Sequence, residues 1–259
     1  MKQYRMILLC VTLALVVCTS EEEAYDYDIE RTEIRTWSAL GINQISVSTH
    51  NGAITASATQ DTMITAEITR RCSGTDSIDA EEHIDDIEIN EYIAFGELTL
   101  EAEMPSSDGR NYQGAFDITT PPSKYLKLIT VNGDILVQDM INGARLRTIN
   151  GAITIEDLRG SINGGTVNGA IYCVMAELTA NESVNFGTTN GEVTLLLPSD
   201  VSADFEAWTT SGDVTITGFS VVTYTTNLPN HKAGTIGSVG GNAVVDIDVA
   251  IGNITIQAN

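Results

Sequence analysis

The chain is poor in positively charged residues. It has 13 Lys and Arg against 35 Asp and Glu among 259 residues, and its formal net charge is −22. Nucleic acids and anionic lipid headgroups are polyanions, so a surface with this excess of carboxylates repels both. We therefore exclude nucleic acid as a partner and expect no binding to the surface of an anionic membrane.

Histidine is scarce as well. Its three copies, His50, His83 and His231, lie in separate neighbourhoods, and none has a metal-ligand spacing such as His-x-x-x-His. No Gly-x-Ser-x-Gly phrase is present that would place a serine nucleophile on a sharp turn. We predict no catalytic residue, no metal site and no cofactor.

Carboxylates are abundant, but their spacing does not form a calcium loop. The run from Asp76 to Glu91 contains Glu81, Glu82, Asp85, Asp86 and Glu88, which are oxygen donors of the kind that calcium prefers. Neither the EF-hand spacing nor the Gly-Gly-x-Gly-x-Asp phrase of calcium-binding β-rolls occurs. The run is predicted to be a solvated acidic insert.

Long apolar runs are absent apart from one near the N-terminus. It extends from Met6 to Cys18, too short to cross a bilayer, and follows Lys2 and Arg5. This arrangement is typical of an export signal. The phrase Leu15-Val16-Val17-Cys18 resembles a lipobox, with Val17 where a small residue is usual, so we expect lipidation at Cys18.

The leader predicts the first two segments of the chain. Residues 1–18 are assigned to a signal peptide of lipoprotein type and residues 19–28 to an acidic tether. The alternative is ordinary cleavage after Ser20, which would give a secreted protein. Loss of Lys2 and Arg5 with the leader changes the net charge to −24.

Cysteine is too scarce for a disulfide framework. Cys10 and Cys18 belong to the leader, which leaves Cys72 and Cys173. One disulfide could join these two residues, but Cys173 occupies an apolar position of a repeated strand. Two buried thiols are therefore the favoured interpretation.

The chain is rich in one short phrase, Thr-x-Asn-Gly-x-Ile, and its variants. From Asn132 the copies follow at intervals of 18, 18, 22 and 21 residues, and a degraded copy closes the chain at Ile251-Gly252. A fixed phrase at a nearly fixed period is typical of stacked repeat units. The predicted turn residues are Asn51 and Gly52, Asn132 and Gly133, Asn150 and Gly151, Asn168 and Gly169, Asn190 and Gly191, and Ser211 and Gly212.

These repeats predict an all-β, single-stranded β-helix-like β-solenoid with coils of about 18–22 residues. A meander of hairpins is the rival fold, because Asn-Gly is a strong signal for a two-residue hairpin turn. Each coil has a second glycine turn about half a period later, at Asn142-Gly143 and Arg159-Gly160. Phrases that recur one full coil apart would stack in register, which favours the solenoid.

Residues after each turn alternate between apolar and polar, as in a strand with one buried face. Outward positions are predicted at Thr55, Leu136, Thr154, Tyr172, Thr194, Thr215 and Thr255. Inward positions are predicted at Ile54 and Ala56, Ile135 and Val137, Ile153 and Ile155, Ile171 and Cys173, Val193 and Leu195, Val214 and Ile216, and Ile254 and Ile256.

Two further segments complete the predicted organisation. Residues 29–128 form an irregular N-terminal β region whose first repeat joins the stack, and residues 129–259 form the regular coils with a C-terminal cap. The strands expected at Ala243–Asp248 and Asn253–Gln257 are predicted to be that cap, because the open end of a solenoid exposes unpaired backbone.

Taken together, the export signal, the Asn-Gly-Ala-Ile phrase, Ile118-Thr119-Thr120-Pro121-Pro122, the serial coils and the final Gly-Asn-Ile-Thr-Ile resemble the bacterial "putative adhesin" family. This is a domain family of unknown function, made of exported β-solenoid surface proteins. The resemblance covers nearly all of residues 29–259 and implies a surface location. It carries over no catalytic or binding residues.

We interpret the chain as a non-enzymatic, exported cell-envelope or surface protein, an adhesin or scaffold, held by a lipid anchor. Its expected partner is a surface protein or a glycan, and its only contact with the membrane is that anchor. The alternative is a carbohydrate-active β-helix enzyme, a polysaccharide lyase or hydrolase. Arg145, Arg147 and Arg159 are the only basic residues of the regular coils and are interpreted as solvated edge charges. Trp37, Trp208 and Tyr172 are too scattered to form a sugar-stacking platform.

Overall fold

The computed structural model describes residues 27–105, 110–238, 240 and 242–259. The predicted signal peptide, Cys18 and most of the predicted tether lie outside these residues.

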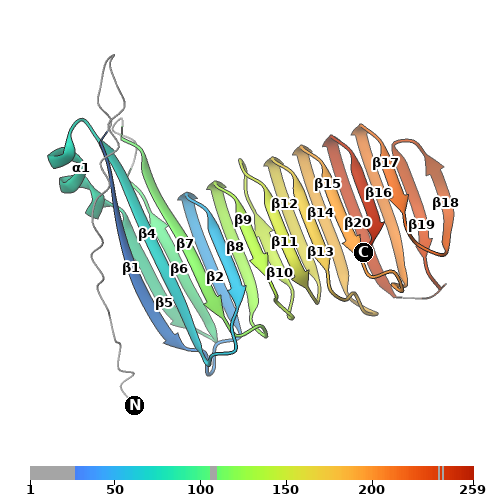
Figure 1. Ribbon diagram of the computed structural model, residues 1–259, viewed down its shortest axis with the longest axis horizontal. Coiled ribbons are helices and arrows are strands. Elements are labelled where there is room, and N and C mark those ends of the chain that lie inside the picture. Colours follow the sequence, from blue (N-terminus) through green and yellow to red (C-terminus); the bar gives the residue numbers. More distant parts are fainter. Residues whose placement is uncertain (1–26, 106–109, 239, 241) are drawn as a thin grey trace.

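The described chain folds into two long β-sheets that face each other along one axis (Figure 1). Sheet A contains, in spatial order, β1 (Tyr27–Ser38), β4 (Met63–Gly74), β7 (Tyr112–Thr120), β3 (Ile54–Ala58), β9 (Ile135–Gln138), β11 (Ile153–Leu158), β13 (Ile171–Met175), β15 (Val193–Leu197), β21 (Ile254–Ala258) and β17 (Val214–Thr217).

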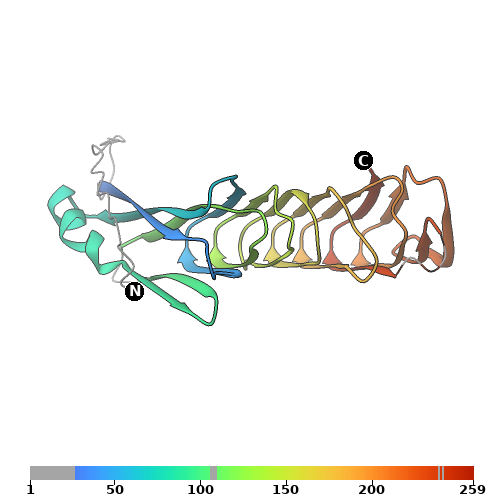
Figure 2. The same cartoon turned by 90° about the horizontal axis from the view of Figure 1, so that it is seen from below.

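Sheet B lies behind sheet A in Figure 1, and the two walls are seen edge-on in Figure 2. Its spatial order is β18 (Val222–Leu228), β19 (His231–Ile236), β16 (Ala203–Ser211), β20 (Ala243–Ile251), β14 (Ser183–Asn190), β12 (Ile162–Asn168), β10 (Ala144–Arg147), β8 (Tyr125–Asn132), β2 (Gln44–Asn51), β6 (Glu97–Glu103) and β5 (Glu88–Ala94).

Each repeat contributes one strand to sheet B, crosses at its Asn-Gly turn and contributes the next strand to sheet A. Successive repeats pair in parallel, so that Asn163 lies opposite Asn185 and Ile153 lies opposite Ile171. A hairpin meander would pair successive strands antiparallel. The β-solenoid prediction is therefore confirmed.

The core fills the space between the two sheets and runs through the whole stack. The predicted inward residues of sheet A are buried, with the exception of Ile216, which is only partly buried because β17 is the edge strand of that sheet. Cys173 is one of these inward residues and forms no disulfide. Cys72 is also buried, on β4, and no disulfide joins it to Cys173, in agreement with the favoured interpretation.

The prediction that the closing strands cap the stack is wrong. Strands β20 and β21 lie inside it, between the coil of β14 and β15 and the coil of β16 and β17. Their apolar residues gain a neighbouring coil on both sides, which an end position would not provide. The outer side of β16 is covered by the antiparallel hairpin of β18 and β19.

The N-terminal end of the stack shows the same displacement. A coil made of β6 and β7 lies outside the coil of β2 and β3, although it comes later in the sequence. Strands β1 and β4 extend sheet A beyond it, and β5 extends sheet B, all by antiparallel pairing.

A short helical segment covers this end, formed by α1 (Ser77–His83) and η1 (Ile84–Asp86) (Figures 1 and 2). The carboxylate of Asp76 caps α1 by accepting hydrogen bonds from the backbone N–H groups of Ile78 and Asp79. Within the described residues no helix has the length and apolar content needed to cross a membrane.

Candidate functional site

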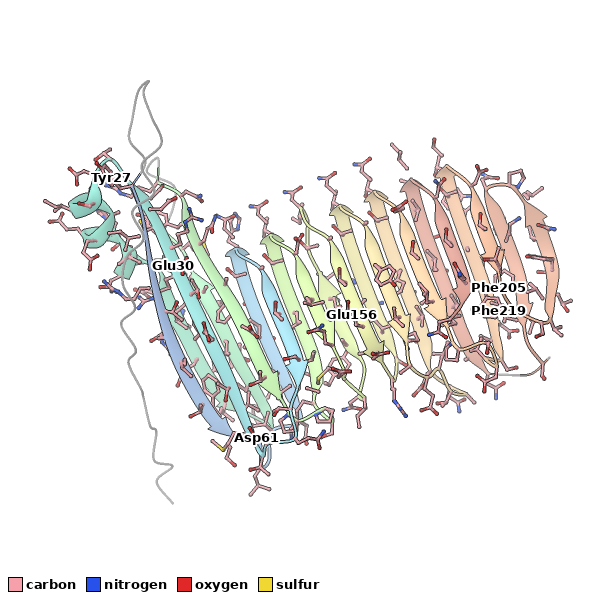
Figure 3. All side chains as sticks on the ribbon, in the orientation of Figure 1. Tyr27, Glu30, Asp61, Glu156, Phe205 and Phe219 are labelled. Atoms are coloured by element: carbon pink, nitrogen blue, oxygen red, sulfur yellow. The ribbon has the colours of Figure 1, made fainter. Side chains whose placement is uncertain are left out.

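The predicted turn residues lie in a single column along one edge of the stack. From Asn132 onward each Asn side chain donates its amide to the Asn one coil away, with nitrogen-to-oxygen distances of 2.6 Å for Asn132 to Asn51, 2.7 Å for Asn150 to Asn132, 2.8 Å for Asn168 to Asn150 and 2.9 Å for Asn190 to Asn168. The amide of Asn51 donates to the carbonyl oxygen of Tyr112 at 3.1 Å. Figure 3 shows a regular row of side chains along this edge. Beyond Asn190 the equivalent positions are Ile251 and Ser211.

The glycine that follows each Asn is required by close backbone contact between coils. A Cβ on Gly151 would lie 2.0 Å from the carbonyl oxygen of Gly133, and a Cβ on Gly169 would lie 1.9 Å from that of Gly151. Real Cβ atoms do not approach a carbonyl so closely. The Asn-Gly phrase is thus a stacking element of the solenoid rather than a hairpin turn.

The threonine two positions before each Asn points inward and, with the exception of Thr49, bonds to the neighbouring coil. The hydroxyl groups of Thr148, Thr166 and Thr188 donate to the carbonyl oxygens of Gly133, Gly151 and Gly169, at 2.9, 3.0 and 3.0 Å. The inserted coil has Val249 at this position. The phrase is therefore explained by stacking, since its polar groups bond to one another between coils.

The acidic insert is held by arginines from sheet A. Arg31 donates to Asp85 at 2.5 Å and to Glu81 at 2.9 Å, and Arg70 donates to Asp85 at 3.1 Å. The Arg31 guanidinium is the main cause that lowers the pKa of Asp85. These ion pairs fasten the helical segment to β1 and β4, so the insert is not simply solvated.

The three histidines lie on separate elements. The ring of His83 bonds to Asp86 at 2.7 Å, that of His231 bonds to Glu206 at 3.0 Å, and His50 is exposed on β2. The described part of the chain contains no group of three or more His, Cys, Asp or Glu that could hold a metal ion.

The outward side of sheet B, here called the outer B face, carries two rows of side chains that cross the strands in register. The first row is Ser46, Lys127, Arg145, Asn163, Asn185, Asp246 and Glu206. The second row is Ser48, Ile129, Arg147, Gly165, Gly187, Asp248 and Trp208.

Arg145 and Arg147 lie on this face and not at an edge of the stack, so their assignment as edge charges is wrong. Arg147 donates to the carbonyl oxygen of Leu146 at 2.9 Å and to the side chain of Asn163. Burial, and then the charge of Arg145, lower the pKa of Arg147. Arg159 does lie at an edge, where it pairs with Glu177 at 2.8 Å.

The aromatic residues do not gather into a platform. Trp208 is 44% exposed on the outer B face, Tyr172 lies on the outward side of sheet A, and Trp37 lies on β1. Arg147 and Asp248 share a row but are three strand steps apart, or about 14 Å at the usual strand spacing. This distance is too long for the two groups to act on one bond.

A family model described as Toastrack DUF4097 matches residues 29–257 of the chain. Among solved structures, one titled as a "putative cell adhesion protein" from Clostridium sporogenes is 15% identical, with a TM-score of 0.53, and the match covers 89% of this chain and 100% of that one. A "putative adhesin" from Bacteroides fragilis is 12% identical, with a TM-score of 0.43, and the match covers 88% and 97% of the two chains. No curated protein matches the sequence. The likeness to the Clostridium structure supports the solenoid fold.

Proposed function

Because the chain belongs to the Toastrack DUF4097 family, which covers residues 29–257, we propose that it is a non-enzymatic protein of the cell surface or envelope that acts as an adhesin or scaffold. Its partners are a surface protein or a glycan. A lipid on Cys18 is its only contact with the membrane.

The observation that carries this proposal is the continuous stack with its two long outward faces. The polar groups of the repeat are satisfied between coils, and one uninterrupted core supports both sheets. Such a body is rigid along its length and presents a large surface without a catalytic centre.

The described chain begins at Tyr27 on the edge strand of sheet A. A tether from Cys18 would therefore attach at one end of the stack and leave the other end free.

Anchoring is tested by labelling cells with a fatty acid. Wild type should incorporate the label, and Cys18→Ser should abolish incorporation, because a lipobox lipid is attached to the cysteine itself. Cys10→Ser is the matched control and should retain the label. A mature, unmodified N-terminus at Glu21 in mass spectrometry would contradict the anchor and favour a secreted protein.

Display and binding are tested separately. Cells that produce the chain should expose it to an externally added protease or antibody, and the purified protein should bind to a glycan array or to intact partner cells. Incubation with acidic polysaccharides should release no new reducing or unsaturated ends. Such release would support the enzyme alternative.

A further inference from the structure

The outer B face lacks carboxylates over five neighbouring strands. In a chain with 35 acidic residues, none of the outward positions from β2 to β14 is Asp or Glu. These positions are Gln44, Ser46, Ser48 and His50 on β2, Tyr125, Lys127, Ile129 and Val131 on β8, Arg145 and Arg147 on β10, Asn163, Gly165 and Val167 on β12, and Ser183, Asn185, Gly187 and Thr189 on β14.

Three cations lie side by side within this region. Lys127 is directly opposite Arg145 on the neighbouring strand, and Arg147 follows two residues later. Like charges in such positions repel each other. Within the described residues neither Lys127 nor Arg145 has an ion pair, and Arg147 bonds only to neutral oxygens. By contrast, Arg31, Arg35, Arg70, Arg71, Arg110 and Arg159 all have carboxylate partners.

Four carboxylates gather on the next two strands of the same face, Asp204 and Glu206 on β16 and Asp246 and Asp248 on β20. Glu206 also bonds to the ring of His231 at 3.0 Å. Asp246 lies directly opposite Glu206, and Asp248 follows two residues later on β20. Burial is the main cause that raises the pKa of Asp246, followed by the charges of Asp248 and Glu206. These carboxylates also repel one another, and a cation brought to them would relieve the repulsion.

The two clusters are related by symmetry. Consider the midline between β12 and β14. In the first row Arg145 and Asp246 lie on the second strand to either side of it, and Lys127 and Glu206 lie on the third. In the second row Arg147 and Asp248 are related in the same way. A two-fold axis parallel to the strands at this midline places every one of these cations opposite a carboxylate of a second copy.

We propose that the outer B face is a self-complementary interface, at which two copies of this chain pair face to face about that axis. Lys127 then meets Glu206 of the partner copy, Arg145 meets Asp246 and Arg147 meets Asp248, each pair occurring twice. This is the isologous contact expected of a two-fold dimer.

The neutral residues of the face fit the same arrangement. Gly165 and Gly187 lie on either side of the axis. The side chain of Arg147 lies over Gly165, with Nη1 3.1 Å from the position of a Cβ on that glycine, and its guanidinium is therefore next to the axis. Ile129 lies opposite Trp208 of the partner copy, and both are apolar. Ile149 and Val167, 44% and 39% exposed, are covered as well. Facing sheets pack about 10 Å apart, a gap that Lys and Arg side chains span.

The axis reverses the direction of the stack, so the N-terminal ends of the two copies lie at opposite ends of the dimer. If the proposed anchoring holds, such a dimer can join chains tethered to two facing surfaces. This bridging role rests on the proposed function, whereas the pairing itself does not.

Charge exchange tests the pairing. Full-length chains with two different tags are mixed in a mild detergent at about 0.15 M salt, where charges separated by more than about 8 Å are screened, and one tag is captured. Wild-type copies should capture each other. Arg145→Glu alone and Asp246→Lys alone should each weaken self-capture by about a hundredfold, because each substitution enters the dimer twice and a close interfacial pair contributes about tenfold or more.

The decisive sample is a mixture of the two single variants. The carboxylate introduced by Arg145→Glu in one copy then faces the ammonium introduced by Asp246→Lys in the other. The unchanged Asp246 of the first copy also faces the unchanged Arg145 of the second. Both opposite-charge pairs are restored, so capture should return. Arg159→Glu, outside the face, is the matched control and should pair like wild type.

If either variant fails to fold, as judged by its thermal melt, Arg147→Glu and Asp248→Lys replace the pair. The proposal is overturned if wild-type copies do not capture each other, if the single variants pair like wild type, or if folded variants do not pair when mixed.

Discussion

At the scale of single residues, most polar groups of the repeat act on the residue one coil away. The Asn amides bond to the Asn of the neighbouring coil, the Thr hydroxyls donate to the carbonyl oxygen of its turn glycine, and the turn glycines pack against one another. Each contact is modest, about 1 kcal/mol for a hydrogen bond, but it recurs in coil after coil. Val249 and Ile251, which take the places of Thr and Asn, belong to the inserted coil, and Thr49 of the first repeat bonds within its own coil.

Asp85 provides a test at this scale. Since the ion pair with Arg31 lowers the pKa of Asp85, the stability it adds is present above the unfolded value, about 3.8, and is lost as pH falls through the folded pKa. Asp85→Asn should therefore speed hydrogen exchange in α1 at neutral pH and have little effect in strong acid.

The expected effect is below about 1 kcal/mol, because the pair is exposed to solvent. Glu82→Gln removes a charge from α1 itself at a position with no ion pair in the described structure, and it should leave exchange unchanged. Equal effects of Asp85→Asn at neutral and acid pH would contradict the assignment of the ion pair.

At the scale of elements, the alternation of residues within strands carried most of the predictive information. Inward and outward positions follow from a period of two, and the coil follows from repetition of the phrase, because both are local patterns. The coil of β6 and β7 was not recognised as a repeat, since it lacks the phrase. Gly114 nevertheless takes the place of the turn glycine, and a Cβ on Gly52 would lie 2.2 Å from its carbonyl oxygen.

Alanine substitution of two glycines tests whether the turn glycines are needed for close stacking of the coils. Gly151→Ala should lower the free energy of unfolding by about 1–3 kcal/mol or more, because the added Cβ collides with the backbone of the next coil and forces it to move. Gly187→Ala places its Cβ at 3.7 Å from the nearest atom, an ordinary contact, and should change stability little. Denaturant titration of both variants measures the difference, and equal losses would contradict a role for the glycine column in stacking.

At the scale of the whole molecule, the order of coils in space is the feature that sequence could not predict. A repeat phrase defines which residues stack but not which neighbour they stack on, because every coil presents the same turn and the same apolar wall. This order places Lys127, Arg145 and Arg147 on one side of β12 and β14, and Asp246, Asp248 and Glu206 on the other. It places residues that are 59 to 121 positions apart in sequence on one face.

Removal of β20 and β21 tests the order directly. A chain ending at Ser238 should lose protection from hydrogen exchange in β16 and β17, because their parallel partners would be absent. Strands from β8 to β15 should stay protected, since coils in a solenoid depend mainly on their neighbours. Retained protection in β16 would mean that the closing strands are dispensable there, as a terminal cap would be.

The inserted coil also has a consequence for the time course of folding. If the chain passes through an export channel with its N-terminus first, the coils from β8 to β15 can assemble in the order in which they emerge. The segment from Ala203 to Ile236 emerges next but cannot take its final place, because the strands that separate it from β14 and β15 are still to come. The coil of β20 and β21 therefore inserts into the interior of the stack after the coils on both of its sides have emerged. This long-range step is expected to be slower than the stacking of successive coils, and during it two unfinished sheet edges are open to export chaperones or to pairing with another chain.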